Sequence, residues 1–274
     1  NLTIPEGSMF LLMGPNGSGK TTLLKIVLGL VKPTRGVARV LGLDPWKKRH
    51  EMFKRVGAML ERHSMPKWTT GRRILEYLAK LKGLREPRKE ALKVAKIFEV
   101  DEYWDRNIST YSAGMLRKIA VAHAFLGDPE LIVLDEPMVT LDKQTRLILR
   151  NIIRDRKDRT YIVSSHVVME LEEIATHIAV LNRGRIVIAG SIRDVAEKLG
   201  LNRIMIKTSN MERALRILMK KEYDVRASSG KIIVETAQSP KILLELLEKE
   251  NIEASIEIVE PSVWSIYAKS LLKQ

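Results

Sequence analysis

The sequence predicts an α/β domain with a mostly parallel sheet and a helical insert, followed by a small α+β domain. Apolar runs of strand length alternate with longer helical patterns in the first part of the chain. Strand signals disappear in a central stretch, and a strand-helix-strand-strand-helix-strand order follows near the end. We therefore predict domains at 1–200 and 201–274, with a helical subdomain at about 67–127.

Each element of the first domain follows from a short-range pattern. Apolar runs predict buried strands, and Lys32–Gly36 predicts a turn between the first helix and the strand that follows it. The expected strands are Ser8–Met13, Val37–Leu41, Val56–Leu60, Leu131–Leu134 and Thr160–Ser164, with a closing antiparallel hairpin of Ile178–Leu181 and Arg185–Ala189. The expected helices are Lys20–Leu30 and Lys143–Arg154, and the insert begins with helices built on Ile74–Leu81 and Ala91–Phe98.

The second domain is predicted from six patterns that follow one another closely. The expected elements are the strands Arg203–Thr208, Asp224–Ser228, Lys231–Thr236 and Glu253–Val259, with the helices Met211–Glu222 and Lys241–Glu250. Ser239 before Pro240 is a good helix start, and Ser262 marks the start of a final helix. The order βαββαβ is that of a small ferredoxin-like domain.

Composition excludes several classes of protein. The 274 residues are 45% apolar and 29% charged, as in an ordinary globular protein, and the absence of cysteine excludes disulfide frameworks and thiolate metal sites. Apolar runs fall far below the ~18 residues that cross a bilayer, and the first residues do not resemble a signal peptide. The net charge of +14 is spread along the chain. It favours a basic surface first, proximity to anionic lipid second, and a nucleic-acid partner last.

The stretch from Gly14 to Thr21 matches the phosphate-binding pattern G-x-x-x-x-G-K-[ST], between a predicted strand and a predicted helix. The candidate ligand-binding residues are Gly14, Pro15, Asn16, Gly17, Ser18, Gly19, Lys20, Thr21 and Thr22. Glycines let backbone N–H groups turn toward phosphates, Lys20 reaches the β/γ oxygens, and the Thr21 hydroxyl ligates Mg²⁺. The alternative is a plain glycine turn before a helix. Because motif and context agree, the sequence predicts that the chain binds ATP and Mg²⁺.

Two carboxylates end a buried strand at Asp135 and Glu136. Four apolar residues precede them, as expected for a parallel strand that delivers acids to the carboxyl edge of a sheet. Asp135 is expected to hold Mg²⁺ through water, and Glu136 to take a proton from the attacking water. An Asp-Glu-Pro turn without chemistry is the alternative. The nearby phosphate loop favours the catalytic interpretation.

Three further segments indicate which class of ATP-binding protein the sequence resembles. Tyr111-Ser112-Ala113-Gly114-Met115 opens a helical pattern before the acidic strand, Asp142 follows that strand, and His166 ends the next one. With the phosphate loop and the acidic strand, this ordered set resembles the nucleotide-binding subunits of ABC transporters over roughly residues 1–200. The resemblance implies an ABC-type P-loop NTPase core.

The resemblance assigns a role to each of these segments. Ser112 and the amides of Ala113 and Gly114 form the signature motif, which meets the γ-phosphate of a partner subunit's ATP in this family. It makes Asp142 the D-loop aspartate, makes His166 the switch histidine beside Glu136, and puts Glu61 at the Q-loop position near Mg²⁺. Plain helix caps at Ser112 and Asp142 and a structural or solvated His166 are the alternatives.

Several positions depart from the family pattern. Ala113 replaces a glycine, Tyr111 a leucine and Met115 a glutamine, and Glu61 replaces the usual glutamine with an anion. We expect activity to be kept with an altered rate. The aromatic residue that stacks on adenine in this family lies upstream of the first strand, so the N-terminal part of the domain is expected to be missing and no adenine contact is assigned.

The family role implies a membrane partner. Met65, Trp68, Arg72 and Arg73 form an apolar and basic stretch where the family contacts its membrane-spanning subunit, although Trp68 can equally be a core residue. The tail at 260–267 resembles that of ATPases paired with ABC-2-type drug or antibiotic exporters.

The sequence therefore predicts an ATP-hydrolysing subunit that dimerises on ATP and powers a separate integral membrane permease, as an exporter. We expect it at the cytoplasmic face of the cell membrane, bound peripherally, and without nucleic acid. The alternative is a soluble ABC-type ATPase that acts on nucleic acid or ribosomes. A third possibility makes the βαββαβ domain a regulatory or ligand-sensing module.

Overall fold

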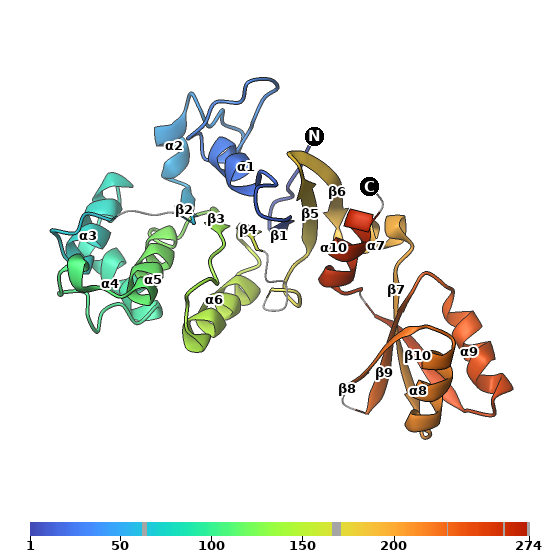
Figure 1. Ribbon diagram of the computed structural model, residues 1–274. Coiled ribbons are helices and arrows are strands. Elements are labelled where there is room, and N and C mark those ends of the chain that lie inside the picture. The colour runs from blue at the N-terminus through green and yellow to red at the C-terminus, as the bar shows by residue number, and fades with distance from the viewer. Residues whose placement is uncertain (62–64, 166–170, 229, 260, 273–274) are drawn as a thin grey trace. The chain divides into compact units, whose positions relative to one another are not determined.

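The computed structural model of the chain resolves two compact units, Asn1–Ile186 and Val187–Gln274 (Figure 1). Residues 1–274 are described except 62–64, 166–170, 229, 260 and 273–274. The domain boundary expected near residue 200 stays a prediction.

A six-stranded sheet has five of its strands in the first unit, and its sixth strand, β6, begins there and continues into the second. Its strands are β1 (Met9–Met13), β2 (Val56–Met59), β3 (Leu131–Asp135), β4 (Thr160–Ser164), β5 (His177–Asn182) and β6 (Arg185–Ser191), in the order β2-β3-β4-β1-β5-β6. The pairs β2–β3, β3–β4, β4–β1 and β1–β5 are all parallel. The mostly parallel α/β fold is thereby confirmed, and the carboxyl ends of these five strands lie at one edge of the sheet.

The central strands are completely buried, as their unbroken apolar runs require. Every residue of β1, β3 and β4 is buried. In the register of these strands, Ser164 lies beside Leu12 on one side and Asp135 on the other. The phosphate loop, which follows β1, therefore starts at the same edge as the carboxylates that end β3. The helices α1 (Lys20–Val27) and α6 (Lys143–Asp155) follow these two segments.

Helices lie between β2 and β3, where the sequence predicts a helical subdomain at about 67–127. This segment contains α3 (Gly71–Leu81), α4 (Pro87–Ile97), a 3₁₀ turn (Ile108–Thr110) and α5 (Ala113–Ala124) (Figure 1). The helices pack on one another through apolar faces at helical spacing, with Leu75, Ala91, Val94 and Ile119 among the buried residues. A short helix before β2, α2 (Arg49–Phe53), was not predicted.

The strand predicted at Val37–Leu41 is wrong. Only an isolated antiparallel bridge joins Val40 to Leu43, through two backbone hydrogen bonds of 2.9 Å. Leu41 and Gly42 both have positive φ, 50° and 79°, so the chain reverses within two residues. The pattern at Val37–Leu41 predicts a strand, but Val37 is 87% exposed and no strand forms there.

The second unit contains a four-stranded antiparallel sheet with the strand order β10-β7-β9-β8. Its elements are α7 (Ile192–Leu199), β7 (Asn202–Thr208), α8 (Met211–Lys220), β8 (Asp224–Ser228), β9 (Lys231–Thr236), α9 (Pro240–Lys249), β10 (Ala254–Val259) and α10 (Val263–Leu272). One sheet face packs against α8 and α9 through a core that includes Ile204, Ile232, Leu218 and Leu243. None of the helices in the described part of the chain combines the length and apolarity needed to traverse a membrane.

The sequence analysis missed α7, although its signals are local. Ser191 caps the helix by accepting a hydrogen bond from Asp194 N over 3.1 Å. Gly200 ends it in the left-handed conformation with φ of 62°.

Candidate functional site

The phosphate loop is shaped by glycines where side chains have no room. A Cβ added at Gly14 would lie 2.3 Å from the carbonyl oxygen of Leu181 in β5, so this position excludes every other residue. Gly19 has φ of 106° and precedes α1 without a side-chain cap. Because Gly19 has no side chain, the N-cap residue offers no acceptor to the first N–H groups of α1, and such N–H groups at a helix start can bind an anion.

Lys20 lies buried over this loop. Its Nζ donates hydrogen bonds to the carbonyls of Gly14, over 2.7 Å, and Pro15, over 3.3 Å, and lies 4.0 Å from Glu136 Oε1. The Ser18 hydroxyl is also buried and has no hydrogen-bond partner among the described residues. A buried ammonium and an unpartnered hydroxyl on a glycine loop fit the oxygens of a phosphate chain. The other predicted loop residues, Pro15, Asn16, Gly17 and Thr22, are exposed.

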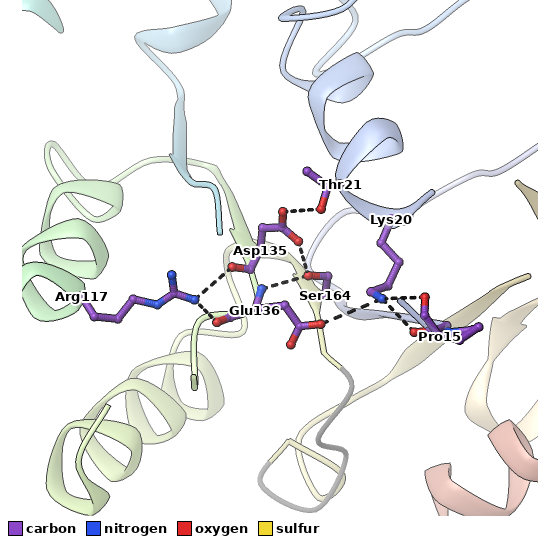
Figure 2. A network of polar contacts seen from close by, with 8 residues as sticks. Pro15, Lys20, Thr21, Arg117, Asp135, Glu136 and Ser164 are labelled. Atoms are coloured by element: carbon purple, nitrogen blue, oxygen red, sulfur yellow. Dashed lines mark hydrogen bonds and ion pairs between the residues drawn. The ribbon is translucent and has the colours of Figure 1, made fainter. Parts of the chain in front are cut away.

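Asp135 is fully buried, and two hydroxyl groups hold its carboxylate (Figure 2). Thr21 Oγ1 donates to Oδ2 over 2.8 Å, and Ser164 Oγ donates to Oδ1 over 2.5 Å. The sequence predicts Thr21 and Asp135, together with Glu61, as Mg²⁺ ligands. It does not single out Ser164, whose only signal is its place at the end of β4. A threonine hydroxyl and a carboxylate beside a phosphate site are the donor set that Mg²⁺ accepts, with substrate oxygens completing its shell. The residues present therefore fit this ion.

Glu136 has a strained backbone that is held in place by β4. Its φ is 51°, in the left-handed region that residues other than glycine and asparagine rarely adopt. Its N–H donates to Ser164 O over 3.2 Å and to Ser164 Oγ over 2.9 Å. The side chain is nearly buried and points toward Lys20 (Figure 2). Strain of this kind costs about 1–3 kcal/mol and is concentrated at functional sites.

The structure adds Arg117 to the site, which the sequence analysis did not single out. This arginine of α5 is 4% exposed. Its guanidinium donates to the carbonyls of Glu61, over 3.0 Å, Asp135, over 3.4 Å, and Glu136. Burial lowers the pKa of Arg117. Nothing in the local pattern of α5 distinguishes this arginine from a solvated one.

Ser112 and Asp142 each cap a helix in the structure. Ser112 Oγ accepts from Met115 N over 3.2 Å at the start of α5, and Asp142 Oδ1 accepts from Thr145 N over 2.8 Å at the start of α6. Ser112 and Ala113 are exposed, so the first turn of α5 is open to solvent. A Cβ on Gly114 would lie 3.5 Å from the carbonyl of Thr140.

The remaining predicted residues stand apart from this cluster. Glu61 is exposed, and the structure connects it to the site through its carbonyl rather than its carboxylate. His166 lies outside the described residues. Within the described residues no group of three or more histidine, cysteine, aspartate or glutamate side chains is placed to hold a metal. Thr21 and Asp135 are the predicted Mg²⁺ ligands whose side chains meet in the structure, and the Glu61 ligand stays a prediction.

The chain is similar to known ABC transporter ATP-binding proteins. A family model described as "ABC transporter" matches residues 1–139. An uncharacterized ABC transporter ATP-binding protein of Nostoc sp. is 38% identical over 202 residues, which cover 71% of this chain and 59% of that protein. The chain is also 30% identical to the ABC transporter ATP-binding protein NatA of Bacillus subtilis, over 72% of this chain and 82% of NatA. It is 28% identical to the bacitracin transport ATP-binding protein BcrA of Bacillus licheniformis, over 82% of this chain and 74% of BcrA.

Solved structures share the fold of the first unit. The ATP-binding cassette MJ0796, solved as a dimer in a post-hydrolysis state with ADP and Pi, superposes with a TM-score of 0.64 at 25% identity, over 70% of this chain and 88% of that one. The ATP-binding subunit of an ABC transporter superposes with a TM-score of 0.68 at 24% identity, over 73% and 85%. The second likeness concerns the fold alone.

Proposed function

The chain belongs to the ABC transporter family of ATPases, and on this premise we propose that its hydrolysis of ATP powers a separate permease in the membrane. One observation carries the proposal: Lys20, Asp135 and Glu136 converge at the carboxyl edge of the sheet beside the phosphate loop (Figure 2). Cation, metal-binding carboxylate and base are the parts that phosphoryl transfer to water requires.

The proposed chemistry divides among these residues. Lys20 leaves the carbonyls of Gly14 and Pro15 and binds the β/γ oxygens of ATP, where its charge offsets the charge that develops in the transition state. Glu136 accepts a proton from the attacking water. Thr21 and Asp135 hold Mg²⁺, which when bound neutralises phosphate charge and orients the chain of phosphates. The proposed Glu61 ligand and the proposed His166 hydrogen bond complete the site.

In the proposed dimer, each subunit contributes residues that contact the γ-phosphate of the ATP bound to the other subunit. The first turn of α5, with Ser112, Ala113 and Gly114, is open to solvent, as it must be to receive the nucleotide of a second subunit. MJ0796 was solved as a dimeric cassette, which supports the same arrangement here. Asp142 lies at the start of α6 and is proposed to face the partner.

The proposed permease contact lies on the insert. Trp68 is 82% exposed, so the core interpretation of this residue is excluded. Met65 is half-buried and Arg73 exposed beside it, whereas Arg72 is held by an ion pair of 2.9 Å to Asp105. An exposed tryptophan flanked by basic residues is typical of a protein interface. We place the subunit peripherally on the cytoplasmic face of the membrane.

The proposed direction is export. It rests on the tail at 260–267 and on the relative BcrA, which is described as a bacitracin transport protein. The second unit has the βαββαβ order and the β10-β7-β9-β8 sheet, which we assign to the ferredoxin-like class, as a regulatory or ligand-sensing module.

Two experiments test this function. Glu136→Gln is expected to bind ATP, to lose turnover and to accumulate as a dimer when ATP is present, measured by phosphate release and size-exclusion chromatography. A variant that hydrolyses ATP at the parental rate removes Glu136 from the role of base. Affinity purification from detergent-solubilised membranes is expected to recover an integral membrane protein. ATPase activity stimulated by added RNA or DNA, without such a partner, would instead favour the nucleic-acid-dependent alternative.

A further inference from the structure

We propose that Arg117 is a positioning residue for ATP hydrolysis: it holds the main chain of Glu136 in the conformation that aims the carboxylate at the phosphate site. The inference rests on the proposed role of Glu136 as the base. The hydrogen bonds of Arg117 go to the main-chain carbonyls of Glu61, Asp135 and Glu136 rather than to the phosphate loop. Figure 2 shows Arg117 on the opposite side of Asp135 and Glu136 from Lys20.

The main chain of Glu136 is held from both sides. Its N–H donates to Ser164 of β4, and its carbonyl accepts from Arg117 of α5. Between these two contacts the backbone has φ of 51°. A left-handed glutamate relaxes unless its surroundings prevent it, since the conformation is unfavourable by about 1–2 kcal/mol. A rotation about this backbone would swing the carboxylate away from Lys20.

The guanidinium has the geometry for this task. Its Nη2 reaches two consecutive carbonyls, those of Asp135 and Glu136, while Nη1 reaches the carbonyl of Glu61. A planar fork of donors can serve three acceptors at once, whereas the ammonium of a lysine is a point charge on a flexible stem. Within the described residues, no carboxylate lies at ion-pair distance from this buried cation. Its hydrogen bonds in the described part of the chain go to main-chain carbonyls.

The hydrogen bond from Arg117 also connects the main chain of Glu136 to helix α5. Arg117 lies in α5, five residues after Ser112, the N-cap of that helix. A displacement of α5 against the sheet would therefore act on the Glu136 carbonyl directly.

The test is the steady-state ATPase of the full chain, with ATP affinity measured separately by titration. Arg117→Met keeps most of the apolar stem and removes the donors. We expect kcat to fall about 100-fold, the loss that a misplacement of about 1 Å can produce, while KM and the ATP Kd stay within about 2-fold. Arg117→Lys is expected to recover only part of the loss. Arg55→Met is the matched control, because Arg55 also bonds a carbonyl, that of Leu41, and a carboxylate, that of Glu130, away from the phosphate loop.

Three results would overturn the proposal. They are a kcat loss no larger than in Arg55→Met, a rise in KM with unchanged kcat, and an Arg117→Lys variant with parental kcat. Thermal unfolding with bound ATP checks that each variant is folded. If Arg117→Met does not fold, the comparison of Arg117→Lys with the parent decides.

A double variant separates this inference from the proposed function. In the Glu136→Gln background, Arg117→Met should change single-turnover hydrolysis of radiolabelled ATP by less than about 3-fold, because both substitutions act on one group. Independent, multiplicative losses contradict the inference and leave Glu136 as the base. If Glu136→Gln alone keeps the parental rate, the role of Glu136 as the base in the proposed function fails.

Discussion

Thr21 Oγ1 donates a hydrogen bond to Asp135 Oδ2 over 2.8 Å, across 114 residues of chain. The contact joins the first turn of α1 to the end of β3. It aligns one hydroxyl and one buried carboxylate beside the phosphate loop. Its removal therefore tests whether this pair serves the metal or only the fold.

Thr21→Val keeps the shape of the side chain and removes the hydroxyl. Because hydrogen bonds to charged groups contribute about 1.5–3 kcal/mol, we expect affinity for ATP with Mg²⁺ to fall by roughly 10- to 100-fold. Affinity for ATP in EDTA should fall much less. Titration with a fluorescent ATP analogue in both buffers measures the difference, and Thr21→Ser is the control that should retain affinity. Equal losses with and without Mg²⁺ would make the hydroxyl structural only.

Gly57→Ala should destabilise the first unit. A Cβ at this position in β2 would lie 1.7 Å from the carbonyl oxygen of Ala124, at the end of α5. Overpacking against main chain costs about 1–3 kcal/mol, so the free energy of unfolding in urea should fall by that amount. Gly83→Ala is the control: it has open space but φ of 76°, so only backbone strain of about 1–2 kcal/mol is expected there. A Gly57→Ala variant as stable as the parent would show that β2 and α5 can separate freely.

Asp142→Ala should lower stability in a pH-dependent way. Burial raises the pKa of Asp142, but hydrogen bonds from Thr145 and the Lys118 ion pair outweigh it and lower the pKa to about 2 from the ordinary 3.8. A lowered folded-state pKa stabilises the protein above about pH 4, and that contribution is lost as pH falls toward 2. Loss of the cap should cost about 1 kcal/mol at neutral pH.

The measurement is urea unfolding of parent and variant at several pH values. The difference between them should shrink below about pH 4. Asp142→Asn is the control, because asparagine still caps α6 but does not titrate. A difference that is constant down to pH 2 would show that the charge of Asp142 does not contribute.

Trp68→Ala should separate folding from partner binding. An exposed side chain contributes within about 0.5 kcal/mol to stability, so urea unfolding and ATP affinity should stay unchanged. Recovery of the membrane partner in affinity purification should be lost. Trp264→Ala is a matched control, since Trp264 is 49% exposed and belongs to the second unit. Unchanged recovery of the partner with Trp68→Ala would place the permease contact elsewhere.

Much of the fold could be read from neighbouring residues. The buried strands, the helical insert and the βαββαβ order all follow from periodicities within single elements, which act over a few residues. The strand prediction at Val37–Leu41 was wrong because a strand needs a neighbouring strand to pair with, and the local pattern cannot show whether one is present. In the structure the chain turns back at Leu41 and Gly42 instead.

The phosphate loop, Asp135 at the end of β3 and Glu136 after it can be picked out from local spacing: glycines at set intervals followed by a lysine, and carboxylates after an apolar run. Which atoms approach these acids depends on segments that are distant in sequence. The Ser164 hydroxyl, the Arg117 guanidinium and the left-handed backbone of Glu136 come together only through the parallel register of β3 and β4 and the packing of α5. Sequence periodicity carries no information on such contacts, because a hydrogen bond between distant segments leaves no local pattern.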